Sequence, residues 1–170
     1  HGMVIYRSHS NWDALRDDGI ADAAVAALGI EGLKTIARQK FFSVQKLPEA
    51  MTVRDLQGLV EKALGFPGCR LFGDPRKRIR RFAFLIGGFG ANQIHMPQAA
   101  MEMGAEALII GEMSEFILVA ALEMGLPAIE TLHSMSEIPG IRRQTALLAE
   151  RLPGLRVEYI PSGAMSLGGG

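Results

Sequence analysis

One stretch in the second half of the chain predicts two neighbouring parallel strands joined by a helix. Residues 107–110 form a short apolar run that stops at a glycine, which is typical of a buried strand. The apolar stretch 116–124 has the length of a helix, and Gly125 and Pro127 end it. Residues 128–132 are a second short apolar run. A strand, a helix and a strand in this order form a βαβ unit, whose strands are parallel.

Polar side chains follow both strands of this unit. Glu112 comes after the first strand, and His133 and Glu137 come after the second. Open α/β sheets bind ligands at the carboxyl ends of their parallel strands, and imidazole with carboxylate suits zinc, iron or manganese. We also expect Glu137 to open the next helix, where its charge would favour the helix dipole without any metal. Local spacing leaves both interpretations open.

The remaining elements extend this pattern to an α/β domain. Thr52 and Asp55 predict the capped start of one helix. A turn at residues 73–78 predicts that the strands before and after it pair antiparallel. The expected helices are 20–28, 52–64, 93–103 and 137–152, and the further strands are 3–6, 41–47, 69–72, 79–86 and 155–160. We therefore predict one α/β domain over residues 1–160, with mixed, largely parallel sheets flanked by helices, and a flexible glycine-rich tail over 161–170.

Composition and charge narrow the class of protein. The chain has 18 basic and 18 acidic side chains, so it has no general attraction to nucleic acid or to an anionic membrane. Its single cysteine, Cys69, excludes an internal disulfide framework, and no apolar run has the length of a membrane span. These features predict a cytoplasmic protein. The basic cluster within residues 76–81 is interpreted as a solvated turn and strand edge.

Two further patterns bear on a binding site. Residues 87–90, Gly-Gly-Phe-Gly, follow an apolar strand and precede a helix, which indicates either an anion cradle or a tight turn. The two halves of the chain also repeat one arrangement, a strand followed by a histidine with a carboxylate four residues later. It occurs as His9 with Asp13 and as His133 with Glu137. This repetition predicts one shared metal pocket.

Taken together, these stretches resemble the Nif-three-like dinuclear metal-centre hexamer family, whose members often carry the name GTP cyclohydrolase I type 2 homologue. The resemblance implies that Asp13, His133 and Glu137 hold divalent metal, that His9 belongs to the same site, and that Glu112 lines the pocket. It also implies a homohexamer. The motifs that carry it are His9-Ser-Asn-Trp-Asp13, Leu47-Pro-Glu, Gly73-Asp-Pro, Gly87-Gly-Phe-Gly, Ile110-Gly-Glu-Met and His133-Ser-Met-Ser-Glu137.

The sequence departs from the family pattern at two places. Family members carry a pair of adjacent metal-binding histidines upstream of the first motif, and often a histidine soon after Gly-Glu-Met, where this chain has residues 114–116, Ser-Glu-Phe. We expect a chain that is incomplete at its N-terminus or a divergent member with a reduced site. Two cations about 4 Å apart need bridging anions to offset their repulsion. We therefore expect weak or single metal occupancy unless a neighbouring subunit completes the site.

Three functions remain open at this point. The first is a metal-dependent hydrolase in which the metal activates water and Glu112 moves protons, with a nucleotide, GTP by resemblance, as substrate. The second is a non-catalytic metal-binding oligomer that acts as a scaffold or regulatory partner. The third is an α/β domain with a vestigial site. The sequence contains no serine elbow or cysteine arrangement typical of nucleophilic catalysis.

Overall fold

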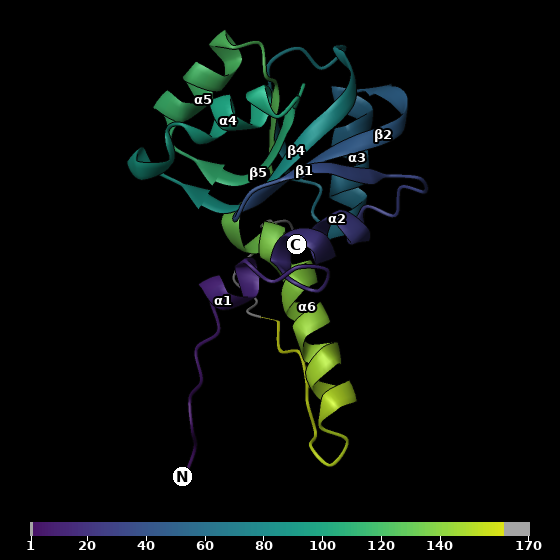
Figure 1. Ribbon diagram of the computed structural model, residues 1–170, viewed down its shortest axis with the longest axis vertical. Helices are drawn as coiled ribbons and strands as arrows, with labels where there is room; N and C mark the ends of the chain where they lie inside the picture. Colours follow the sequence, from purple (N-terminus) through teal and green to yellow (C-terminus); the bar gives the residue numbers. More distant parts are fainter. Residues whose placement is uncertain (1, 162–170) are drawn as a thin grey trace, which may run out of the picture.

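The computed structural model describes residues 2–161, in which one six-stranded sheet lies between two layers of helices (Figure 1). The strands are β1 (Lys34–Arg38), β2 (Phe42–Thr52), β3 (Arg70–Phe72), β4 (Arg78–Phe89), β5 (Leu108–Met113) and β6 (Ala128–Glu130). The helices are α1 (Ser10–Asp13), α2 (Ile20–Ala27), α3 (Val53–Leu64), the 3-10 turn η1 (Ala91–Gln93), α4 (Met96–Glu102), α5 (Glu115–Glu123) and α6 (His133–Arg151). Apart from Pro161, the predicted tail lies outside the described residues.

The sheet has a parallel centre and antiparallel flanks. Its strand order is β1-β2-β4-β5-β6-β3. The pairs β4–β5 and β5–β6 are parallel, whereas β1–β2, β2–β4 and β3–β6 are antiparallel. The α/β class, the mixed sheet and the βαβ unit β5-α5-β6 are therefore confirmed, and the antiparallel share is larger than predicted.

The central strand β4 is apolar on both faces because helices cover both sides of the sheet. Its side chains alternate between two cores, since successive residues of a strand point to opposite faces. Phe82 and Phe84 belong to the core that includes residues of α2, α3 and α6. Ala83 and Leu85 belong to the core beneath α4 and α5. All four side chains are fully buried.

Two predicted strands and one predicted strand pairing are wrong, because an apolar run does not by itself specify a pairing partner. Residues 3–6 form no strand within the described chain, and Val4 and Ile5 are 92% and 93% exposed. Residues 155–160 are also irregular. The strands on either side of residues 73–78 do not pair with each other, since β3 pairs with β6 at the far edge. The edge strand β1 has the polar sequence Lys-Thr-Ile-Ala-Arg, which gave no apolar signal.

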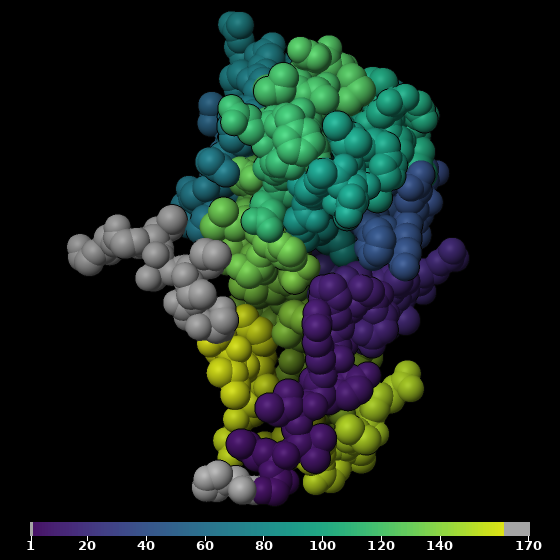
Figure 2. All heavy atoms as spheres, turned by 90° about the vertical axis from the view of Figure 1, so that its left-hand side faces the viewer, coloured from purple at the N-terminus to yellow at the C-terminus, as the bar shows by residue number. Residues whose placement is uncertain are grey.

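Helix α6 projects well beyond the sheet and carries the N-terminal segment along its side (Figure 1). The Trp12 indole N–H donates to the Gly140 carbonyl at 3.1 Å, and the Gln144 amide donates to Ser8 at 3.0 Å. Figure 2 shows the N-terminal residues running over this lower half of the molecule. None of the helices within residues 2–161 is long and apolar enough to span a bilayer.

Candidate metal centre

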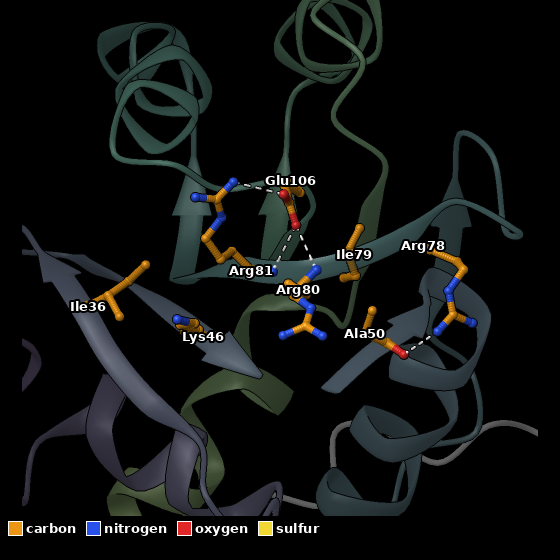
Figure 3. Close-up of a pocket in the computed structure, with 8 residues that line it drawn as sticks. All are labelled: Ile36, Lys46, Ala50, Arg78, Ile79, Arg80, Arg81 and Glu106. Carbon is orange, nitrogen blue, oxygen red and sulfur yellow. Dashed lines mark hydrogen bonds and ion pairs between the residues drawn. The ribbon is translucent and has the colours of Figure 1, made fainter. Parts of the chain in front are cut away.

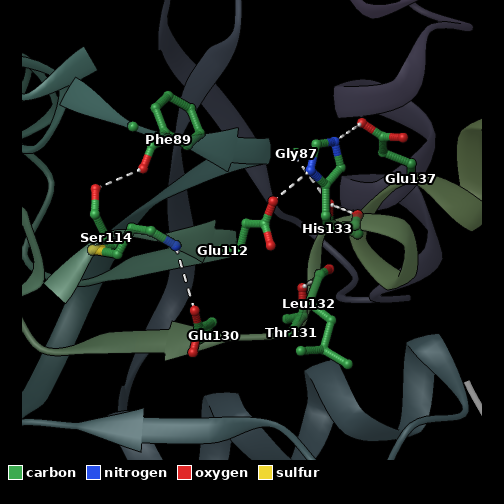
Figure 4. A network of polar contacts seen from close by, with 12 residues as sticks. Gly87, Phe89, Glu112, Ser114, Glu130, Thr131, Leu132, His133 and Glu137 are labelled. Atoms are coloured by element: carbon green, nitrogen blue, oxygen red, sulfur yellow. Dashed lines mark hydrogen bonds and ion pairs between the residues drawn. The ribbon is translucent and has the colours of Figure 1, made fainter. Parts of the chain in front are cut away.

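His133 lies at the centre of a polar network at the carboxyl ends of the parallel strands (Figure 4). Its Nδ1 atom is 2.8 Å from Glu112 Oε1 at the end of β5, and its Nε2 atom is 3.1 Å from Glu137 Oε1. Helix α6 begins at His133 rather than at Glu137 as predicted. Glu137 therefore lies one turn into the helix, where the spacing of four residues places both side chains on the same face.

Two glycines of β4 make room for this network. Gly87 has φ 72°, and a Cβ atom there would lie 3.1 Å from both His133 Nε2 and Glu137 Oε1. A Cβ atom on Gly88 would lie 2.6 Å from Glu112 Oε1. The strand continues through both glycines to Phe89, so Gly87 and Gly88 lie within β4, and only Gly90 forms the connection to η1. This segment of β4 is the surface on which the imidazole and carboxylates pack.

Ser136 fixes the first turn of α6 against β4, and sequence reasoning missed it. Its buried hydroxyl accepts the Gly87 N–H at 3.1 Å and donates to the His133 carbonyl at 2.7 Å. Ser136 belongs to the motif His-Ser-Met-Ser-Glu identified in the sequence. No local pattern, however, distinguishes a serine that bonds a distant strand from an exposed one.

The N-terminal motif reaches the same pocket from the other end of the chain. His9 and Asp13 line a pocket of about 220 Å³ together with His133, Glu137 and the two glycines of β4. The bond between Trp12 and α6 anchors this segment. Glu112 lies at the edge of the site, where it contacts His133 but does not line the pocket. His9, Asp13, His133 and Glu137 therefore converge on one pocket, whereas Glu112 joins it through His133 and does not line it as the resemblance implied.

The charges of the pocket shift the pKa values of its central groups. Burial lowers the pKa of His133, but the hydrogen bond to Glu112 and the negative charge of Glu137 outweigh this effect, so the pKa is raised. Burial raises the pKa of Glu137, which His133 partly offsets and the nearby Asp13 carboxylate increases. A half-buried carboxylate whose pKa is raised by burial and by a neighbouring negative charge lies where a cation would be stabilised.

The donor set fits a borderline divalent cation, although the side chains are not yet arranged as ligands. Imidazole nitrogens and carboxylate oxygens are the ligands that zinc, iron and manganese share. Within residues 2–161, however, no group of three or more His, Cys, Asp or Glu side chains is placed to hold a metal ion. Both ring nitrogens of His133 face carboxylates instead. Glu137 would have to release Nε2 for that atom to serve as a ligand.

Fold and site together define an α/β protein with a histidine–carboxylate pocket at the carboxyl ends of its parallel strands. The sequence profile of Duf34/NIF3 (NGG1p interacting factor 3) matches residues 1–165, so the chain belongs to this family. The resemblance expected from the motifs is thereby confirmed.

Relatives and solved structures agree with this assignment. The chain is 29% identical over 166 residues to the GTP cyclohydrolase 1 type 2 homolog of Clostridium perfringens, covering 93% of this chain and 60% of that protein. The solved structure of protein ybgI, of unknown function, is 26% identical with a TM-score of 0.72, covering 85% of this chain and 56% of that one. Staphylococcus aureus hypothetical protein SA1388 shares the fold, with a TM-score of 0.75 at 16% identity over 93% of this chain and 66% of that one. The chain thus spans less than two thirds of the length of each.

Proposed function

We propose that the chain binds divalent metal and forms part of a metal-dependent hydrolase that acts on a nucleotide. The observation that carries this proposal is the convergence of His9, Asp13, His133 and Glu137, from opposite ends of the sequence, on one pocket. The relative's name, GTP cyclohydrolase 1 type 2 homolog, supports GTP as the first substrate to test.

The residues have separable roles in this proposal. Asp13, His133 and Glu137 would hold the cation, with His9 beside them. A bound divalent cation lowers the pKa of coordinated water and so supplies a nucleophile near neutral pH. Glu112 accepts a hydrogen bond from His133 Nδ1, which directs Nε2 into the pocket, as carboxylates commonly do for metal-binding histidines. The Glu112 carboxylate is half exposed, and in this proposal it would also take part in proton transfer.

A second function, a non-catalytic metal-binding oligomeric scaffold or regulatory partner, is favoured by one observation. Glu112 and Glu137 occupy both ring nitrogens of His133, so three ligating side chains are not preformed. A site whose ligands order only when metal arrives couples metal binding to a structural change, which suits a structural or regulatory role.

Metal content tests the part that both functions share. We expect elemental analysis of protein purified without chelator to show about one ion per chain, the occupancy of one open site. An Asp13→Ala, His133→Ala variant should lose the metal. The matched variant Glu49→Ala, His95→Ala removes one carboxylate and one histidine that are exposed and lie outside this pocket, so it should keep the metal. No metal in the unaltered chain, or equal loss in both variants, would overturn the metal site.

Turnover separates the hydrolase from the scaffold. Metal-loaded protein is incubated with GTP, and formate release is measured. Formate that depends on metal and is lost in Glu112→Gln supports the hydrolase. Stoichiometric metal without formate contradicts GTP ring opening and favours the scaffold.

A further inference from the structure

A second pocket lies at the opposite end of β4 from the candidate metal centre, where β2 leaves its partner strand (Figure 3). Lys46 faces Arg81 across the antiparallel ladder. The next aligned pair is Met51 with Ile79, so residues 47–50 of β2 bulge away from β4. The pocket beside this bulge has a volume of about 510 Å³. This volume is within the range of small-molecule sites, about 300–1,000 Å³.

The carboxylate of Glu106 is bound by donor groups of β4 beside this pocket. Glu106 Oε2 accepts the backbone N–H groups of Arg80 at 2.7 Å and Arg81 at 3.0 Å. Its Oε1 atom accepts from the Arg81 guanidinium at 2.8 Å. The two backbone donors and one terminal nitrogen of the Arg81 guanidinium are therefore paired with Glu106, whereas the buried Arg81 Nε has no hydrogen-bond partner among the described residues.

Two other cations at the pocket have no such partner. Lys46 and Arg80 are exposed, and neither forms an ion pair within residues 2–161. In the view of Figure 3 the Arg80 guanidinium points away from Glu106 and is drawn between Lys46 and Ala50, which line the same pocket. Arg78 also lines the pocket and donates to the Ala50 carbonyl at 2.7 Å. Four cations face one acid here, although the chain as a whole has no net charge.

We propose that this pocket binds a phosphorylated small molecule, with the phosphate held between Lys46 and Arg80. The fork of an arginine matches the oxygens of a phosphate group, and lysine adds a point charge. Ile36 is 45% exposed and lines the same pocket, which provides apolar surface for the organic part of the ligand. A nucleic-acid surface would extend as a basic stripe, whereas these cations surround one hollow. The proposal is independent of the metal-centre function.

Ribose 5-phosphate is the probe, in EDTA so that no divalent cation carries it to the candidate metal centre. The backbone amide signals of Arg80 and Arg81 are followed by nuclear magnetic resonance during the titration, beside a titration with inorganic phosphate. We expect saturable shifts and tighter binding of ribose 5-phosphate than of phosphate. The Lys46→Gln, Arg80→Gln variant should bind about tenfold more weakly or worse, since each charge-assisted contact to phosphate is strong.

The control variant Lys62→Gln, Arg151→Gln also removes one lysine and one arginine charge, but from exposed positions away from the pocket. Its affinity for ribose 5-phosphate should be unchanged. The dispersion of the amide signals shows that both variants are folded. Shifts that do not saturate, equal binding of phosphate and ribose 5-phosphate, or equal weakening in both variants would overturn the proposal. So would tighter binding of a single-stranded oligonucleotide at the same amides, which would assign the surface to nucleic acid.

Discussion

At the scale of single residues, the absence of a side chain at Gly88 is as important to the candidate metal centre as the ligands themselves. A Cβ atom there would lie 2.6 Å from Glu112 Oε1 and 2.9 Å from His133 Nδ1. Both atoms belong to side chains and not to the backbone, so the strand can keep its path while the Glu112–His133 pair moves. The geometry of the site is therefore more sensitive to this position than the stability of the fold.

We expect Gly88→Ala to reduce bound metal while the protein stays folded. The new methyl group separates Glu112 from His133 and so removes the contact that orients the imidazole. Elemental analysis measures the metal, and chemical denaturation measures the free energy of unfolding. Gly58→Ala is the control, because its Cβ atom would meet no atom within 4 Å and alanine favours a helix interior by roughly 0.5–1 kcal/mol. Unchanged metal content in folded Gly88→Ala would contradict this role.

At the scale of elements, the crossing of α2 and α6 links the two halves of the site. Gly140 lies in α6 against α2, and a Cβ atom there would lie 2.5 Å from Ile20 Cδ1 and 2.6 Å from Ile20 Cα. The Gly140 carbonyl also accepts the hydrogen bond from Trp12, which lies one residue before Asp13. The position that lets the helices approach closely is thus also the anchor of the N-terminal motif.

Gly140→Ala should therefore lower the free energy of unfolding by about 1–3 kcal/mol, the usual cost of overpacking a core. Because the backbone of Ile20 blocks the methyl group, the helices must separate, and the Trp12 contact should weaken. Chemical denaturation gives the free energy, and the fluorescence of the single tryptophan reports the contact. Stability as high as that of Gly58→Ala, with unchanged tryptophan emission, would show that the crossing tolerates a side chain.

Local sequence patterns predicted where helices and strands form better than they predicted which strands pair. Thr52 and Asp55 form the predicted capping box, and Gly65 ends α3 in the left-handed conformation. The partner of β3 could not be predicted, because its pairing with β6 joins residues far apart in the sequence, such as Arg70 and Glu130, which are sixty positions apart. At the candidate metal centre, the repeated spacing of a histidine and a carboxylate four residues apart identified the side chains that line the pocket. The contribution of Ser136 depends on a strand 49 residues away.

At the scale of the whole molecule, apolar side chains remain exposed on the half that projects from the sheet. Ile5 is 93% exposed in the N-terminal segment, and Ile160 is 81% exposed beyond α6. Large exposed apolar surfaces on soluble domains commonly mark sites of association. The resemblance to a hexamer-forming family predicts self-association, and these exposed apolar residues are the first positions at which to test it.

We predict that the chain self-associates through this surface, and that Ile5→Ser with Ile160→Ser shifts the equilibrium towards the monomer. Serine removes apolar area that burial would stabilise by about 25 cal/mol per Å². Sedimentation velocity over a range of protein concentrations measures the distribution of species. Phe116→Ser with Val119→Ser is the control, since these α5 side chains are similarly apolar, half exposed and on the opposite part of the molecule. A chain that is monomeric at all concentrations would contradict the prediction, whereas dissociation by the α5 variant alone would assign the interface to the helical face above the sheet.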